Sequence, residues 1–478
     1  MNLRRVQRRA LIWTIGSVLL AASALGHAET VDVSQWKDLF AFSYDYTLVE
    51  TAGLDRNHEP VEVTVSVPGG KTQAWQEHVR VVRLENDLAG EVVPHQLLGA
   101  TRAVAEPKDT RPVPAPAESV NVLFLASCPA HGRVTYRLFW GLPESATDAL
   151  PVLPQAVEET GLRVAGETPG LEIANEFYTA QLDPKSGSLM NARLAGRDES
   201  ETMFYRHVPM HFALDVWSPP QGWDHDYDWP SPPNQRCESG TLAVRYSRWG
   251  PLAKYPDVIA SITYTFYAHV PWIHVSAIME FTEARSARAA RIGEIVVSHT
   301  HREGPNEKDA DGKSPDVFTH YGWPTDQGTV FRIEVNTHRD EEGRANLEGV
   351  EPGTLGILDR DMPWVAGWEQ NRSYGMATLR KDQFAGNRLG NPIPKTVPCT
   401  YVANYGWGFT YWSRPVVYPF GARGTPEDQN TAIAAGTLFA CEEALLFFEP
   451  DEQLTQVRDA HMRFMTPLRL DFKGTGPW

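Results

Sequence analysis

Short runs of alternating apolar and polar residues, separated by turn signals, constrain the fold of this chain more than any other feature. A strand places successive side chains on opposite faces, so alternation with a period of two fits half-buried strands. Turn sequences such as Pro68-Gly69-Gly70 and Asp183-Pro184-Lys185-Ser186-Gly187 separate many of the runs. The pattern therefore predicts an all-β chain. The runs rich in β-branched and aromatic residues are Val61–Val67, Val120–Leu125, Arg133–Trp140, Leu242–Tyr246, Ile259–Tyr267, Ile273–Phe281 and Ile292–His299.

One segment has helical spacing, and two segments suggest how the chain divides. Asp451–Phe464 carries apolar residues three and four positions apart, which predicts a helix. Residues 103–118 are rich in proline and charge and are typical of a long loop within a domain. Residues 141–160 have the composition of an interdomain linker. We expect a small N-terminal β-domain over 30–142, a linker over 143–159 and a larger domain over 160–478.

The first 28 residues have the pattern of a signal peptide. Four arginines, the first Arg4 and the last Arg9, precede the largely apolar run Ala10–Ala22. Gly26-His27-Ala28 then provides small residues at a cleavage site before Glu29. The apolar run is short for a membrane span. We therefore expect export to the periplasm or beyond the cell, with no membrane attachment after cleavage.

Charge and cysteine content exclude several classes of function. The formal net charge is −16, and it becomes more negative when the four arginines of the signal peptide are removed. Such a chain is a poor partner for nucleic acid or an anionic membrane. Cys128, Cys237, Cys399 and Cys441 lie far apart with no CxxC pair, which argues against a zinc–thiolate site. Disulfides and buried free thiols both stay open.

Two segments are similar to known carbohydrate-active families. Tyr46–Pro68 resembles the opening of exported proteins of the exo-rhamnogalacturonan lyase-like group. Leu171–Leu194 resembles the start of a galactose-mutarotase-like β-supersandwich, with Asn175, Tyr178, Asp183 and Gly187 in the strand–turn–strand pattern. The resemblance implies that the larger domain, residues 160–478, is a mutarotase-like supersandwich. It also implies a polysaccharide or oligosaccharide substrate. Fold alone does not decide the reaction.

An aromatic stretch at Tyr401–Pro415 suits either a sugar-binding cleft or an aromatic strand pair in a core. Sugar rings stack on aromatic faces, and an arginine can hold a carboxylate with two hydrogen bonds. Strands also favour aromatic residues. In this stretch we interpret Trp407 and Trp412 as stacking platforms and Arg414 as a carboxylate ligand.

Histidines and tyrosines supply candidate acid–base groups. His299 and His301 follow a predicted strand, and two residues at i and i+2 share a face about 7 Å apart. They could bind a metal with a third ligand, or line a polar cleft wall. His320 and Tyr321 stand side by side, with Trp323 two residues on. A neutral base and a phenol are what β-elimination from a uronic acid requires, and a nearby cation stabilises the enolate.

A third cluster, Trp223–Pro230, alternates aromatic and acidic residues. Acids at i, i+2 and i+4 suggest a calcium loop, but the central glycine and terminal glutamate of an EF-hand loop are absent. A loop over a sugar cleft and a solvated loop anchored by its tryptophans both remain open. Hydrolysis would need two facing carboxylates. The acids available for it include Asp215, Glu294 and Glu369, with Glu369 the most notable because two tryptophans precede it closely.

Together these observations predict a carbohydrate-active enzyme, with a polysaccharide lyase favoured. The alternatives are a glycoside hydrolase on the same fold and a non-catalytic glycan-binding protein. No cofactor is required for the elimination; a divalent cation, either calcium or a histidine-bound metal, is compatible with the sequence. The predicted catalytic residues are His301, His320, Tyr321 and Tyr405, and the predicted substrate-binding residues are Arg302, Trp323, Trp407, Trp412 and Arg414.

Overall fold

The computed structural model describes most of the chain between residues 30 and 473. The described ranges are 30–34, 36–67, 78–99, 118–141, 160–197, 210–298, 318–334, 356–358, 360–370, 373–395, 399–405, 409–417 and 430–473. Nearly all regular structure in these ranges is β, and every strand pairing is antiparallel. The predicted all-β class is confirmed, and apart from Leu242, which directly precedes β16, the described residues of each predicted run lie in a strand. The described ranges contain no helix long and apolar enough to cross a membrane.

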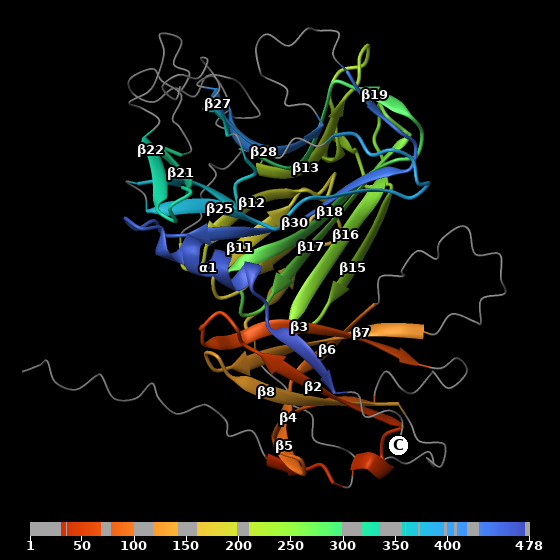
Figure 1. Cartoon of the computed structure of the whole chain (residues 1–478), viewed down its shortest axis with the longest axis vertical. Coiled ribbons are helices and arrows are strands. Elements are labelled where there is room, and N and C mark those ends of the chain that lie inside the picture. Colours follow the sequence, from red (N-terminus) through yellow and green to blue (C-terminus); the bar gives the residue numbers. More distant parts are fainter. Residues whose placement is uncertain are drawn as a thin grey trace, which may run out of the picture.

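The N-terminal body consists of two sheets that enclose an apolar core (Figure 1). One has the order β1 (Thr30–Asp32), β5 (Ala89–Val93), β4 (Val79–Asn86), β8 (Arg133–Trp140), β2 (Phe42–Val49) and β31 (Arg469–Lys473). The other has the order β3 (Arg56–Val67), β7 (Glu118–Cys128) and β6 (His95–Gly99). A short 3-10 helix, η1 (Trp36–Asp38), follows β1.

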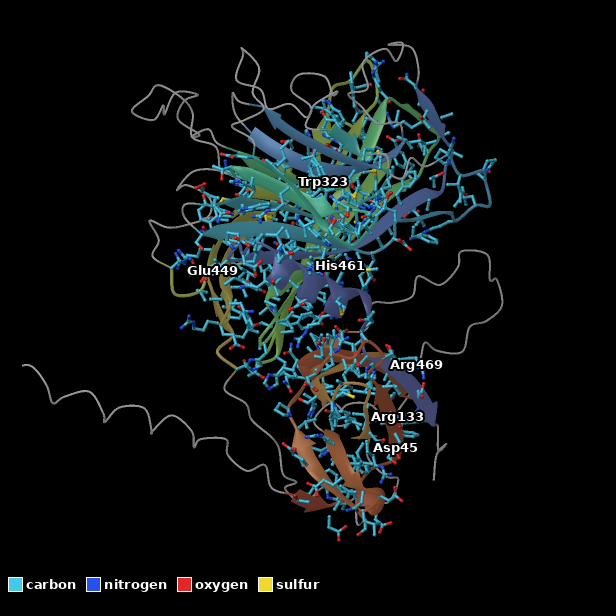
Figure 2. All side chains as sticks on the ribbon, turned by 60° about the vertical axis from the view of Figure 1, so that its left-hand side comes forward. Asp45, Arg133, Trp323, Glu449, His461 and Arg469 are labelled. Atoms are coloured by element: carbon cyan, nitrogen blue, oxygen red, sulfur yellow. The ribbon has the colours of Figure 1, made fainter. Side chains whose placement is uncertain are left out.

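The last strand of the chain belongs to this first body. β31 pairs with β2 over five residues, from Asp45 opposite Lys473 to Val49 opposite Arg469. Figure 2 shows Arg469 beside Arg133 and Asp45, which come from the N-terminal part of the sequence. The predicted linker lies outside the described residues. β31 falls within the range 160–478 that we expect for the larger domain, and it pairs in the N-terminal sheet.

The larger body is a β-sandwich whose core lies between its sheets. Its largest sheet has the order β15 (Asn234–Ser239), β16 (Ala243–Pro251), β17 (Val258–Tyr267), β18 (Trp272–Phe281), β30 (Thr437–Phe448), β25 (Tyr374–Arg380), β24 (Trp364–Glu369), β21 (His320–Pro324) and β22 (Val330–Glu334), with β26 (Phe384–Asn387) also on β30. The facing sheet has the order β14 (Asp224–His225), β13 (Met210–Trp217), β20 (Ala289–Ser298), β28 (Phe409–Val417), β27 (Thr400–Tyr405) and β23 (Gly356–Leu358).

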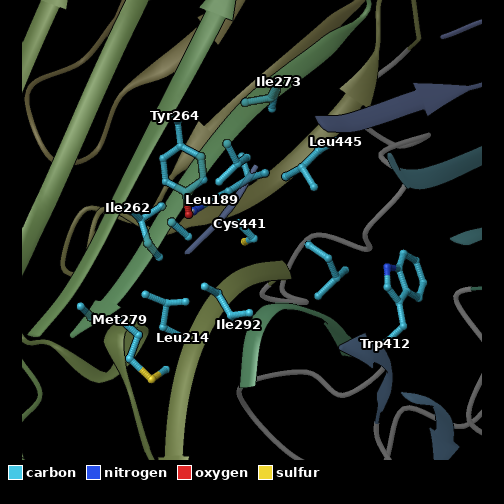
Figure 3. Close-up of a cluster of buried hydrophobic side chains, with 14 of the residues drawn as sticks. Leu189, Leu214, Ile262, Tyr264, Ile273, Met279, Ile292, Trp412, Cys441 and Leu445 are labelled. Carbon is cyan, nitrogen blue, oxygen red and sulfur yellow. The ribbon is translucent and has the colours of Figure 1, made fainter. Parts of the chain in front are cut away.

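Two smaller sheets and one helix complete the sandwich. The order of the four-stranded sheet is β12 (Leu189–Leu194), β11 (Tyr178–Leu182), β10 (Glu172–Ala174), β9 (Arg163–Ala165), and a two-stranded sheet joins β19 (Arg285–Ala287) to β29 (Thr431–Ile433). Side chains from all four of these sheets meet in one core, part of which Figure 3 shows around Tyr264 and Cys441. The predicted helix is present as α1 (Thr455–Met465), whose buried face packs on β25 and β30.

The segment that resembles the mutarotase-like opening folds as its pattern predicts. Asn175 accepts hydrogen bonds from the N–H groups of Phe177 and Tyr178, which starts β11. Asp183 accepts from Lys185 and Ser186 in the turn, and Gly187 adopts a φ of +68° there. Asparagine and aspartate favour such turns because their short side chains bond to nearby backbone.

All four cysteines in these ranges are free thiols, as one of the two alternatives requires.

A buried carboxylate joins the N-terminal body to the end of α1. Glu50 accepts hydrogen bonds from the N–H groups of Ala52, Gly53 and His131 and from the Arg56 guanidinium. Arg56 in turn donates to the carbonyl of Thr466, just after α1. Removal from water acts to raise the pKa of Glu50. The hydrogen bonds outweigh that effect and lower the pKa to about 2.

This network predicts how stability depends on pH. A carboxyl whose folded pKa is depressed stabilises the fold above its unfolded pKa, and the contribution is lost as the pH falls toward the folded value. Glu50→Gln should therefore reduce the free energy of unfolding at pH 7 by about 3 kcal/mol, as for a broken buried ion pair. The deficit should shrink between about pH 4 and pH 2. Urea melts from pH 7 to pH 3, with the exposed Glu85→Gln as control, measure it. A deficit that stays constant over this range would contradict the assignment.

Candidate functional site

Three adjacent strands place a histidine, an aspartate and an arginine in one row across the sheet. His225 of β14 lies directly opposite Asp215 of β13, and Asp215 lies directly opposite Arg291 of β20. Cross-strand partners sit about 5 Å apart and share a face, so these side chains must interact. The Arg291 guanidinium binds both oxygens of Asp215, and the His225 Nε2 lies 3.7 Å from Asp215 Oδ2.

A glutamate joins this row through an irregularity in β20. Ala213 pairs with Glu294, and Asp215 pairs with Arg291. One residue of β13 separates these two pairs, whereas two residues of β20 separate them, so β20 carries one extra residue. In a regular strand, residues three apart point to opposite faces; the extra residue of a bulge puts them on the same face. Arg291 Nη1 accordingly lies 2.7 Å from Glu294 Oε1.

The acidic loop that follows β13 builds the wall of the site. Asp224 points inward and accepts from the N–H of Lys254, while Asp226 accepts from the N–H of Leu214 and from Arg248. The acids of the loop therefore do not converge on one ion, in contrast to the calcium-loop interpretation. Asp224 and Asp226 are buried, Asp228 is exposed, and Trp223, His225 and Tyr227 between them are partly exposed.

The aromatic side chains of that loop form a row next to the acids. His225 stacks between Trp223, at a centroid distance of 6.2 Å, and Tyr227, at 4.6 Å. The Arg291 guanidinium lies 4.3 Å from the centre of the Trp223 ring, a cation–π contact. Asp215 and Glu294 are buried, whereas Trp223, His225 and Tyr227 are partly exposed. The cluster therefore reaches solvent through its aromatic side chains.

The protonation of these groups differs from that of free side chains. Burial raises the pKa of Glu294 to about 8, and the charge of Asp215 adds to the rise against the opposing pull of Arg291. Burial lowers the pKa of His225, but the combined effect of Asp228, Asp215 and Glu294 is larger and raises it, so the net shift is upward. Burial and the nearby carboxylates also raise the pKa of Tyr227, which keeps its phenol protonated. A buried acid that titrates near neutrality is suited to proton transfer.

The same cluster offers ligands of the kinds that metals use. Asp215, His225 and Glu294 each present one ligand atom, and these atoms lie within 4.8 Å of one another. However, Arg291 already pairs with both carboxylates, and a guanidinium is a repulsive neighbour for a cation. The residues therefore suit proton transfer better than a metal ion, and no step below involves a metal.

The structure describes the side chains of two of the four predicted catalytic residues, and both belong to β21, in the sheet that faces the one carrying this cluster. His301 lies outside the described ranges, as does the side chain of Tyr405. His320 stacks on Trp368 at 5.3 Å, and its Nδ1 lies 2.9 Å from the Thr319 hydroxyl, which also contacts Glu369. Burial lowers the pKa of His320. Tyr321 is fully buried in the sandwich core. A catalytic role for Tyr321 gains no support from this position.

The predicted substrate-binding residues are also mostly internal. Arg302 and Trp407 lie outside the described ranges. Trp412 is fully buried and donates its indole N–H to Thr378, so no ring face is left for a sugar (Figure 3). Trp323 (labelled in Figure 2) is 6 % exposed and stacks on Phe331 at 4.8 Å. Arg414 is buried between the sheets and binds Asp361 and Glu443. The described side chains of Tyr401–Pro415 therefore fit the alternative of an aromatic strand pair in a core.

The comparisons with known proteins give no family for this chain. No family model matches it, and no curated protein does. Among solved structures, an alpha-mannosidase from Enterococcus faecalis V583 is 12% identical, with a TM-score of 0.43, and the match covers 92% of this chain and 47% of that one. A glycosyl hydrolase family 38 protein from Enterococcus faecalis is also 12% identical, with a TM-score of 0.43 and coverages of 93% and 50%. The chain thus spans about half the length of these two proteins.

A shorter solved structure is matched over its whole length. A galactose mutarotase-like protein from Lactobacillus casei ATCC 334 is 12% identical, with a TM-score of 0.33, and the match covers 60% of this chain and 100% of that one. Similarities this weak carry no conclusion about reaction or substrate. The function must be argued from the cluster itself.

Proposed function

We propose that this chain is an exported polysaccharide lyase that cleaves a uronate-containing glycan by β-elimination at the Asp215–His225–Glu294 cluster. The observation that carries the proposal is a buried glutamic acid with a pKa of about 8 beside an imidazole, a phenol and a guanidinium. Elimination requires a base for the C5 proton, an acid for the leaving oxygen, and positive charge near the sugar carboxylate. The cluster offers all three.

In the proposed reaction, Glu294 in its ionised form takes the proton from C5. The electron pair of that C–H bond forms the C4–C5 double bond, and the bond from C4 to the glycosidic oxygen breaks. Tyr227, whose raised pKa keeps it protonated, donates its proton to the leaving oxygen. Arg291 and protonated His225 stabilise the charge that develops on the sugar carboxylate. Asp215 holds both cations in place.

A two-carboxylate hydrolase is less well supported by the same geometry. Its acid and its base or nucleophile must flank the glycosidic bond, with carboxyl groups about 5–9.5 Å apart. Here oxygens of the two carboxyl groups lie within 4.8 Å of each other and Arg291 pairs with both, so the two groups stand together and do not face each other across a bond. A pure binding protein would not need a buried acid that titrates near pH 8.

Ultraviolet absorbance during incubation with a panel of uronate polysaccharides tests the proposal. Elimination leaves a double bond conjugated to the carboxylate, so we expect absorbance to rise. New reducing ends without that rise would indicate hydrolysis. Saturable binding without either product would indicate a binding protein. Either of these two results would overturn the proposed lyase activity.

The phenol has its own conservative test. Tyr227→Phe removes the proton donor but keeps the ring that stacks on His225. We expect kcat to fall by about 10²-fold, with KM changed little, since general acid catalysis contributes 10²–10⁴. The drop should be smaller for substrates with a more acidic leaving group, which need less protonation. An unchanged kcat would remove Tyr227 from the mechanism.

A further inference from the structure

The extra residue in β20 needs a glycine. Gly293 lies between Ile292 and Glu294, where β20 has two residues facing one on both of its neighbours, β13 and β28. Its φ is +66°, a left-handed conformation in which a side chain costs energy. Ile292 and Ile295 on either side remain in the apolar core. The bulge is therefore the local feature that turns Glu294 toward Arg291 and Asp215.

A carboxyl group from the opposite sheet fills the space where a side chain of Gly293 would lie. Glu443 of β30 is fully buried, and a Cβ on Gly293 would lie 2.8 Å from the Glu443 Cδ. Carbon atoms in contact stay about 3.5–4.0 Å apart, so no room is left for even a methyl group. The bulge thus rests directly on this carboxyl group.

Glu443 is itself held on several sides. Arg414 Nη1 donates to Glu443 Oε1 at 3.2 Å, and this ion pair crosses from one sheet to the other. Arg414 belongs to β28, where it lies opposite Ile292 of β20, next to the bulge. Arg380 lies opposite Glu443 on β25, and Asp361 binds Arg414 through both of its oxygens. Glu443 Oε1 is therefore anchored by Arg414, and Arg380 Nε lies 3.8 Å from the same oxygen.

We propose that Glu443 is a positioning residue that supports the Gly293 bulge from beneath and so fixes Glu294 at the catalytic cluster. This inference rests on the proposed function for its kinetic consequence, but its geometry does not. A misplacement of about 1 Å in a catalytic group can cost 10²-fold in rate. The size of the residue at position 443 should therefore matter more to Glu294 than its charge.

Two variants separate size from charge. Glu443→Asp keeps the charge but withdraws the carboxyl group by one carbon–carbon bond, about 1.5 Å. We expect a fall in kcat of at least tenfold with KM within about twofold, because the bulge loses its support. Glu443→Gln keeps the size and should leave kcat within about threefold. Leu445→Ala, a buried change on the same strand, lowers stability without touching the bulge and should leave kcat near its native value.

A second readout works whether or not the protein is a lyase. In protein labelled with ¹³C at the glutamate carboxyl carbons, the Glu294 signal is the one lost in Glu294→Gln. Glu443→Asp should move the midpoint of its titration, whereas Glu443→Gln should not, because the charges acting on Glu294 are those of Arg291, Asp215 and His225. Gly293→Ala should also move the titration midpoint of Glu294. This variant replaces Glu443→Asp in the test if Glu443→Asp does not fold.

The outcomes are decisive in both directions. If Glu443→Asp and Gly293→Ala leave the titration midpoint of Glu294 unchanged, Glu443 does not position it. A larger effect of Glu443→Gln than of Glu443→Asp would show that charge, and not support of the bulge, is what matters, and would also overturn the inference. A native protein that lacks elimination activity but shows the predicted shifts would leave the positioning role intact and count against the lyase reaction alone.

Discussion

Replacing Glu294 with glutamine is expected to lower the kcat of elimination by about 10³-fold, within the 10²–10⁴ range of general base catalysis. The amide has nearly the same shape and can still accept from Arg291, but it cannot take the C5 proton. In the native enzyme, the rate should rise with pH as Glu294 ionises, along a limb with an apparent pKa of about 8. That limb should disappear from the residual activity of the variant. Initial rates between pH 5 and pH 10 measure both effects.

The control for this result is Glu283→Gln, an exposed carboxylate after β18, which should leave rate and pH profile unchanged. A native pH limb in Glu294→Gln would assign the base to another group. His320, and His301 outside the described residues, would then be tested next. Full activity in the variant would contradict the proposed site.

Replacing Arg414 with leucine is expected to reduce the free energy of unfolding by about 3–5 kcal/mol, the usual cost of removing one partner from a buried ion pair. The variant leaves Glu443 buried without its closest cation and removes the ligand of Asp361. Burial already raises the pKa of Glu443, so the orphaned carboxyl group can escape the penalty by taking up a proton. The loss should therefore be larger at pH 8 than at pH 5. Urea melts at the two pH values measure it.

Arg388 provides the matched control. It pairs with Glu280 at 3.5 Å, and both side chains are partly exposed. Such pairs contribute about 0–1 kcal/mol. Arg388→Leu should therefore change stability little at either pH. A cost for Arg414→Leu below 1 kcal/mol would mean that the inter-sheet network does not hold the sandwich together, and the support proposed for the bulge would weaken with it.

The fold could be predicted from local patterns because each pattern has one physical meaning. Alternation with a period of two marks strands such as Ile273–Phe281, and spacing of three and four marks α1. The turn at Asp183 follows from side chains that bond to their own backbone. The place of β31 could not be predicted in this way, since its partner β2 lies more than 400 residues away.

The candidate site was only partly visible in the sequence. The alternation of Trp223 to Trp229 was noted, but which alternate residues face inward depends on contacts with Leu214, Arg248 and Lys254. Asp215 and Glu294 appeared only among many available acids, because their pairing is set by cross-strand register and a bulge. Arg414 and Trp412 carry the residue types of a sugar site, yet the opposite sheet buries them. Burial of this kind comes from distant parts of the chain.

The pairing of β31 with β2 also has a consequence for how the protein is made. The first β-body to emerge during synthesis cannot complete its sheet until residues 469–473 have been translated. Until then, the edge of β2 is an unpaired strand that could join another chain. Completion of the first body therefore requires that the chain has been made through residue 473, and a chain truncated before β31 would leave both the first sheet and the attachment of α1 unfinished.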